Sequence, residues 1–300
     1  MARAQDAAEP PEAGKETLTI SFKKRGVDGI EVKWLDLDTS LGIPLFEVNV
    51  AGQALCAGLG TTTARSLIDS AALTAMGLQS EASQQVLTLD GADGLVQRTD
   101  VLSVEVPDQF SFQSTLRATQ LPDAACRSGE KLSFVLGRDV LDSVAFAIDP
   151  KGRRILFGPS GSINPTSDRF ARIEWKDGLI VATLADSAVL LDLALLSRPV
   201  VTLEASHFPR VFPDQAIETL NDKQGSKGRK GIDTSKLSMG PLTLDAAVLL
   251  GADNDDAADG SVGFTVFSFF PTIFDAGKDQ ILIRVPDLPA EAETEGAEGD

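Results

Sequence analysis

The sequence predicts a mainly β protein built from two related lobes, and three observations carry that prediction. Short runs that alternate apolar and polar residues recur along the chain between turn residues, a pattern typical of strands. Several short motifs recur at one fixed offset, which indicates an internal duplication. Between the two copies, residues 158–168 are rich in Gly, Ser and Pro, a composition typical of a linker.

In the first half, the expected elements follow from alternation and turn residues. Residues 45–50 alternate and end at Ala51-Gly52-Gln53, which predicts a strand and a hairpin turn. A short helix is expected over 70–76. Residues 86–96 predict a second hairpin, with its turn at 90–94, and 101–106 predict a further strand.

The duplication is read from motifs that recur without a gap. The offset of 126 residues is shared by Gly137 and Gly263, Asp149 and Asp275, and Ile155 and Ile281. We also interpret Trp175 as the counterpart of Trp34. The expected organisation is a disordered segment 1–16, a lobe over 17–160, a linker over 161–167, a lobe over 168–287 and a disordered acidic tail over 288–300.

Composition excludes several classes of function. The net charge of −17, from 27 Lys and Arg against 44 Asp and Glu, argues against a nucleic-acid partner. The chain has no run of about 18 apolar residues, so we expect no membrane insertion. Two Cys and one His do not suffice for a zinc site of the usual type; we expect no metal and no cofactor, with an all-carboxylate metal site as the alternative.

Three segments and a later motif suggest a family. Residues 44–53, 58–68 and 71–78 resemble one lobe of a retropepsin-type or pepsin-like aspartic protease, and 136–141 (LGRDVL) resembles that family's Leu-Gly-x-Asp-x-Leu hallmark. The resemblance covers about 30–157 directly and 170–286 through the repeat. It implies two homologous pepsin-like β-barrel lobes with an interlobe cleft.

The expected active-site motifs are degenerate. The resemblance puts Gly60 at the position of the catalytic Asp, followed by Thr61, Thr62 and Thr63. In the second lobe, a match at 210–213 puts Glu204 at the corresponding position. The residues expected to line the cleft are therefore Gly60, Thr61, Thr62, Thr63, Glu204, Ala205, Ser206 and His207. The family also implies a flap over the cleft, and its expected residues are Asp90, Gly91, Asp93 and Gly94.

This degeneracy bears directly on the chemistry. Aspartic proteases hold two carboxylates so close that they share a proton, and one of them activates a water. Gly60 supplies no carboxylate, and the chain has no Tyr for the flap. We therefore expect a catalytically inactive pseudo-protease that binds a peptide or protein through its cleft or surface. The alternatives are an active aspartic-type endopeptidase that uses Glu204 and a structural or assembly protein with a vestigial cleft.

Four further features leave alternatives open. Cys56 and Cys126 either form a disulfide in an oxidising compartment or stay as two thiols; a periplasmic or secreted protein is favoured, and a cytoplasmic one stays open.

The acidic residues 253–259 form either a solvated loop or a calcium site. The basic residues 223–236 are interpreted as a mobile surface hairpin or disordered insertion, with docking of an anionic partner as the alternative. His207 is interpreted as a loop histidine at the cleft edge rather than a catalytic base.

Overall fold

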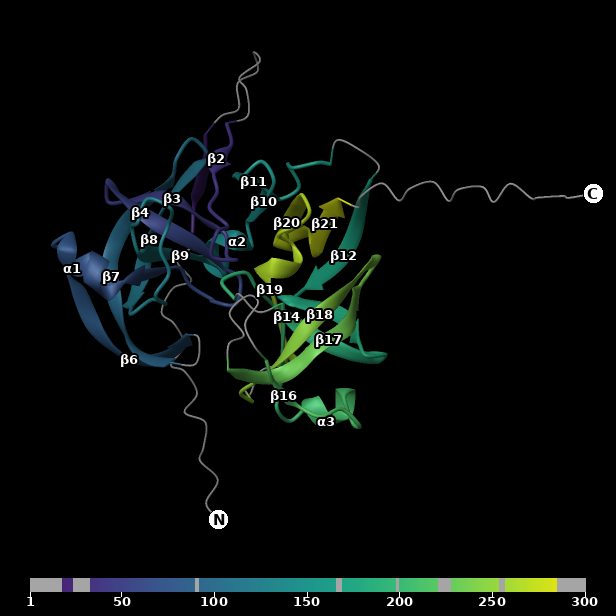
Figure 1. Ribbon diagram of the computed structural model, residues 1–300. Coiled ribbons are helices and arrows are strands. Elements are labelled where there is room, and N and C mark those ends of the chain that lie inside the picture. Colours follow the sequence, from purple (N-terminus) through teal and green to yellow (C-terminus); the bar gives the residue numbers. More distant parts are fainter. Residues whose placement is uncertain are drawn as a thin grey trace, which may run out of the picture.

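The computed structural model of the chain describes residues 18–23, 33–89, 92–165, 169–197, 200–220, 228–253 and 257–284. Strands dominate, and they form two closed six-stranded barrels, which confirms the predicted fold class. Figure 1 shows the first lobe in purple and blue beside the second lobe in green and yellow. The predicted tails 1–16 and 288–300 lie outside the described residues.

The first barrel is closed where β7 pairs with β8 as well as with β3 and β6. Its strand order is β1-β8-β5-β9-β4-β3-β7-β6. The elements are β1 (Ile20–Phe22), β3 (Leu45–Val50), β4 (Gln53–Gly60), β5 (Leu67–Asp69), α1 (Ser70–Ala75), β6 (Ser80–Leu89), β7 (Ala92–Val106), β8 (Phe110–Thr119), β9 (Leu132–Gly137) and α2 (Arg138–Leu141). The predicted helix begins where the Asp69 carboxylate accepts hydrogen bonds from the backbone N–H groups of Ala71 and Ala72.

The second barrel repeats this arrangement and is closed by pairing of β17 with β13. Its elements are β13 (Leu179–Leu184), β14 (Ser187–Ala194), β15 (Val201–Glu204), α3 (Phe208–Val211), β16 (Glu218–Leu220), β17 (Arg229–Met239), β18 (Leu242–Gly251), β19 (Gly260–Gly263) and η1 (Phe264–Val266), while η2 (Ala276–Lys278) connects β20 (Thr272–Asp275) to β21 (Gln280–Arg284) outside the barrel. Most of the basic segment 223–236 that the structure describes belongs to β17, which pairs with β16 and β18. The expectation of a disordered insertion is wrong for those residues, while 221–227 lie outside the described part.

Six strands between the barrels join the two lobes. They are β2 (Leu35–Asp36), β10 (Val144–Asp149), β11 (Arg154–Pro159), β12 (Phe170–Lys176), β20 (Thr272–Asp275) and β21 (Gln280–Arg284). β10 and β20 pair at the centre, and there the rings of Phe146 and Phe274 stack with their centroids 4.8 Å apart. Figure 1 shows these strands grouped between the lobes. Because both rings are fully buried, one apolar core runs from one lobe into the other.

Backbone geometry confirms the duplication. Gly137 and Gly263 each precede a short helical turn with nearly the same dihedral angles, φ −89° and −87°. Arg153 and Asp279 both have positive φ, at 52° and 51°. The carbonyl of Arg153 accepts a hydrogen bond from the N–H of Leu37, and that of Asp279 accepts one from the N–H of Trp175.

The same hydrogen bonds correct one predicted pair. Arg153 and Asp279 differ by the repeat offset, so Leu37 and Trp175 are counterparts. Trp34 therefore corresponds to Arg172, and the assignment of Trp34 to Trp175 is wrong. The two tryptophans were matched by residue type, whereas burial is what the counterparts share: Leu37 and Trp175 are both buried in the core.

Candidate functional site

The loops that follow β4 and β14 meet at the junction between the lobes. The hydroxyl of Thr61 donates a hydrogen bond to the carbonyl of Leu193 and accepts one, at 3.2 Å, from the N–H of Leu195. Thr61, Leu193 and Leu195 are all buried. One threonine side chain of the first lobe therefore satisfies two backbone groups of the second, away from competing water.

The strand register identifies the true counterpart of Gly60. β4 runs parallel to β9 with Gly60 opposite Gly137, and β14 runs parallel to β19 with Ala194 opposite Gly263. Because Gly137 and Gly263 are counterparts in the repeat, Ala194 corresponds to Gly60. The next residue, Leu195, then corresponds to Thr61, so the second lobe has no hydroxyl to return the hydrogen bonds.

The predicted register of the second lobe is therefore wrong. β5 pairs parallel with β8 and antiparallel with β9, as β15 does with β18 and β19. Within these pairings Glu204 corresponds to Asp69, the last residue of β5. The match at 210–213 failed because Arg210 and Val211 belong to the short helix α3, whereas Leu67 and Ile68 belong to the strand β5.

Glu204 lies far from the junction along its own strand. The N–H of Gly263 donates to the carbonyl of Val200, which places that end of the segment at the level of Ala194. Glu204 is four residues further on, about 13 Å at the usual rise of a strand. Glu204, Ala205, Ser206 and His207 therefore do not face Thr61, and the expectation that they line the same cleft is wrong.

Gly60 has no room for a side chain. A Cβ atom there would lie far inside van der Waals contact of Thr63 Oγ1 and Val135 Cγ1. The Thr63 hydroxyl is held in this place by a 2.9 Å hydrogen bond to the carbonyl of Gly60. Of the predicted residues on this side, Gly60, Thr61 and Thr63 are buried and Thr62 is exposed.

His207 belongs to a separate ionic cluster that holds α3 against β14. Its Nδ1 lies 2.8 Å from Asp259 Oδ1, and Arg210 Nη2 lies 3.0 Å from the same oxygen. The other oxygen of Asp259 accepts a hydrogen bond from the N–H of Leu190. We interpret these contacts as structural, because Asp259 is shared between two side chains of the α3 region and a strand.

The acidic loop before β19 contains a carboxyl group with a shifted pKa. Asp253 accepts a 2.7 Å hydrogen bond from the N–H of Ser206, and this bond holds the pKa of Asp253 below its ordinary value. Residues 254–256 lie outside the described part, so the calcium alternative concerns residues of which only the flanks are seen. Within the described ranges, no group of three or more His, Cys, Asp or Glu side chains is arranged to hold a metal.

Asp139 is a buried carboxyl at the start of α2. Its Oδ1 accepts hydrogen bonds from the Ser66 hydroxyl, at 2.8 Å, and from the N–H of Val140, at 3.1 Å. Its Oδ2 is buried without a hydrogen-bond partner, and burial raises the pKa of this carboxyl above its ordinary value.

The hairpin expected as the flap is present and longer than predicted. β6 and β7 pair from Ser80 opposite Thr99 to Leu89 opposite Ala92. Asp93 pairs with Thr88 and Gly94 with Leu87, while Asp90 and Gly91 lie outside the described residues. Its counterpart in the second lobe is the hairpin of β16 and β17.

Two hollows lie on the first lobe. The larger, of about 470 Å³, is lined by Arg65, Asp139 and residues of β1, β7 and β8. The other, of about 400 Å³, lies along β6 and β7 and is lined by residues that include Glu81, Arg98 and Val101. Neither is lined by the predicted cleft residues, so the predicted interlobe cleft stays a prediction.

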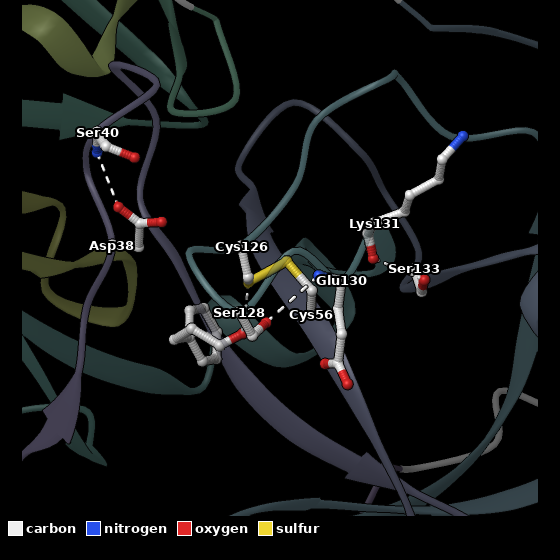
Figure 2. Close-up of a disulfide and its surroundings, with 9 residues drawn as sticks. Asp38, Ser40, Cys56, Cys126, Ser128, Glu130, Lys131 and Ser133 are labelled. Carbon is white, nitrogen blue, oxygen red and sulfur yellow. Dashed lines mark hydrogen bonds between the residues drawn. A yellow bond between two sulfur atoms is a disulfide. The ribbon is translucent and has the colours of Figure 1, made fainter.

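Cys56 and Cys126 form a disulfide, which answers the question that the sequence left open. Figure 2 shows the bond joining the strand that carries Cys56 to the loop that carries Cys126, next to Ser128 and Glu130. The two cysteines are 70 residues apart in the sequence. Leu121 and Ala124 of this loop are buried in the same apolar cluster as Cys56.

Ala194, Leu195 and Leu196 are the junction residues that the sequence reasoning missed. The structure marks the equivalent positions through the two hairpin turns, because Ala51-Gly52 and Ala185-Asp186 both have positive φ values. Counting eight residues forward from Gly52 leads to Gly60, and counting eight forward from Asp186 leads to Ala194.

Comparison with known proteins adds no relative. No family model matches the chain, and a search of curated proteins finds no match. In the part of the chain that the structure describes, no helix has the length and apolar character needed to cross a membrane. The architecture is compatible with a two-lobed pepsin-like fold.

Proposed function

We propose that the chain is a catalytically inactive, aspartic-protease-like protein that binds an extended peptide or protein segment. The observation that carries this proposal is the identity of the two equivalent loop positions, Gly60 and Ala194. A shared-proton dyad needs a carboxylate at both. Here one position has no side chain and no space for one, and the other carries a methyl group.

The active-enzyme alternative depended on Glu204 at the junction. Since Glu204 lies about 13 Å along the strand from the level of Ala194, no observation now favours that alternative. The Thr61 hydroxyl is engaged by two backbone groups of the other lobe, so it serves the junction.

The hairpin of β6 and β7 offers a means of binding that needs no dyad. β6 lies at the end of the strand order, and the described residues place a strand on one of its sides. A two-residue turn makes Leu89 and Ala92 a hydrogen-bonded pair, so by alternation the N–H of Thr88 points away from β7. Such outward groups bind an added strand through main-chain hydrogen bonds.

The disulfide bears on the cellular compartment in which this proposed function takes place. Structural disulfides persist in the periplasm and outside the cell, and they are rare in the reducing cytosol. We therefore include export in the proposal, with the partner met in an oxidising compartment.

The test is peptide selection followed by edge substitution. Phage-displayed random peptides are selected on the oxidised protein, and the best binders are measured by calorimetry and then examined by mass spectrometry for cleavage. Thr88→Pro removes the outward N–H, whereas Thr88→Ala keeps it and is the matched control. We expect selected peptides to stay intact, to bind Thr88→Ala like the parent, and to bind Thr88→Pro about tenfold or more weakly because main-chain bonds are lost. Failure to select any binder, cleavage of the binders, or equal binding by both variants would contradict the proposal.

A further inference from the structure

The Cys56–Cys126 disulfide lies beside the contact between the lobes. We propose that it is a redox-sensitive lock on that contact: its reduction by a dithiol loosens the packing of Leu196, from the second lobe, against the first lobe. The proposal does not depend on peptide binding or on the absence of catalysis.

The segment 120–131 covers part of the first barrel and is bonded largely to itself. The N–H of Cys126 donates to the carbonyl of Glu130, that of Gly129 to the carbonyl of Cys126, and Lys131 pairs with Asp123. At its start, the N–H of Leu121 donates to the Asp69 carboxylate at the end of β5. The disulfide to Cys56 on β4 ties down the middle of this covering segment.

Leu196 packs against the cluster that this segment covers. The cluster is a set of buried first-lobe residues: Ile43, Leu45, Cys56, Leu67, Leu121, Ala124, Leu132 and Val135. Cys126 and Leu196 both pack against it as partly buried neighbours. A side chain from the second lobe therefore shares one apolar cluster with both halves of the disulfide.

Gly58 makes the approach of Leu196 possible. A Cβ atom at Gly58 would lie far inside van der Waals contact of Leu196 Cδ2, and 3.5 Å from side-chain carbons of Leu45 and Leu132. The missing side chain on β4 thus gives Leu196 its place beside the cluster. The neighbouring Leu195 carries the N–H that binds Thr61, so apolar packing and the polar bridge lie on adjacent residues.

The second lobe lacks the equivalent arrangement. The counterpart of Cys56 is Leu190, which is exposed and lies opposite the exposed Val181. The counterpart of Leu196 is Thr62, which is also exposed. The covered cluster is therefore a feature of one lobe only, and its covalent anchor is placed where the other lobe makes contact.

The redox step is ordinary thiol–disulfide exchange. A thiolate of the dithiol attacks one sulfur of the disulfide, and the second thiol then displaces the protein sulfur. The Cys56–Cys126 bond breaks, both cysteines become thiols, and the dithiol leaves as its cyclic disulfide, so two electrons are transferred. Without the bond, the covering segment is held by its packing and by the bond from Leu121 to Asp69, and we expect Leu196 to leave the cluster more often.

Amide hydrogen exchange detected by NMR tests this directly. The oxidised protein is compared with the protein in dithiothreitol and with the double variant Cys56→Ala/Cys126→Ala. We expect protection of the Leu195 amide to fall about tenfold or more in both forms that lack the disulfide, while amides of β7, β8, β17 and β18 change less than about twofold. Dithiothreitol should have no effect on the double variant.

Two further variants distinguish a lock from general loosening. In Leu196→Ala the contact is already lost, so reduction should not lower Leu195 protection further. Leu41 packs against the same cluster from within the first lobe, so Leu41→Ala is the matched control and should keep the response. Unchanged Leu195 protection on reduction, an equal loss in β7 and β8, or a full response in Leu196→Ala would overturn the proposal.

Discussion

At the scale of single residues, the junction depends on the Thr61 hydroxyl. Thr61→Val keeps the shape of the side chain but leaves the Leu195 N–H and the Leu193 carbonyl buried without this partner. We expect a loss of about 1–3 kcal/mol in the free energy of unfolding. Urea denaturation measures it, and Thr62→Val, at an exposed neighbour, should change stability by less than about 0.5 kcal/mol. Equal effects of the two substitutions would contradict the role given to Thr61.

Gly60 is a second residue whose environment makes a definite prediction. Gly60→Asp forces a side chain against Thr63 and Val135, so we expect it to lower the free energy of unfolding by about 1–3 kcal/mol. Thr62→Asp, which adds the same charge at an exposed position two residues away, should cost much less. A variant Gly60→Asp as stable as the parent would show that this site has space for a carboxylate.

Asp139 and Asp253 should give stability opposite dependences on pH. Burial raises the pKa of Asp139 above its ordinary value of 3.8. The stability that this carboxyl contributes is therefore fully present at pH values below 3.8, and it is lost as pH rises through the pKa of the folded state. The pKa of Asp253 is lowered, so its contribution is present above 3.8 and is lost as pH falls through the folded pKa. We therefore expect the parent-minus-variant free energy of unfolding to fall from pH 3 to pH 7 for Asp139→Asn and to rise for Asp253→Asn. Urea titrations at the two pH values measure both, and the same sign for both variants would contradict these assignments.

At the scale of elements, the two equivalent hairpin turns allow an exchange of residues. Both turns have positive φ at their two central positions, Ala51-Gly52 in the first lobe and Ala185-Asp186 in the second. Glycine adopts this conformation without the cost that a Cβ atom brings. Asp186→Gly should therefore stabilise the protein by about 0.5–1 kcal/mol and Gly52→Asp should destabilise it by a similar amount. Thermal denaturation of both variants measures the effects, and a shift of the same sign in both would contradict the account.

The elements that the sequence predicted well are those with local signals. The strand over 45–50, its turn, the short helix after Asp69 and the hairpin of β6 and β7 follow from alternation, capping and turn residues. The second-lobe junction was missed because its loop carries apolar residues, Leu195 and Leu196, whose role is set by contacts with the other lobe. The match at 210–213 compared a helix with a strand entry, a difference that only pairing partners reveal.

At the scale of the whole molecule, the repeat yields two similar barrels with different junction loops. The two lobes share the order of their barrel strands, and strands that follow equivalent positions in the two repeats pair where β10 meets β20. The first lobe adds a hydroxyl at Thr61 and a disulfide-anchored cover, and the second adds Leu196. The two equivalent loop positions at this junction, Gly60 and Ala194, carry no carboxylate. In the function proposed above, this two-barrel architecture binds a peptide and does not hydrolyse it.

The central claim is that this junction has no hydrolytic dyad. The most direct test is hydrolysis of a mixed fluorogenic peptide library from pH 3 to 7 by the oxidised protein, with Glu204→Gln prepared identically as the matched control. We predict no cleavage by either protein at any pH, because Gly60 and Ala194 supply no carboxylate. Cleavage by the parent that is lost in Glu204→Gln would contradict the claim and make Glu204 catalytic. Cleavage by both that copurifies with the folded protein would contradict it as well and would place a hydrolytic site elsewhere in the chain.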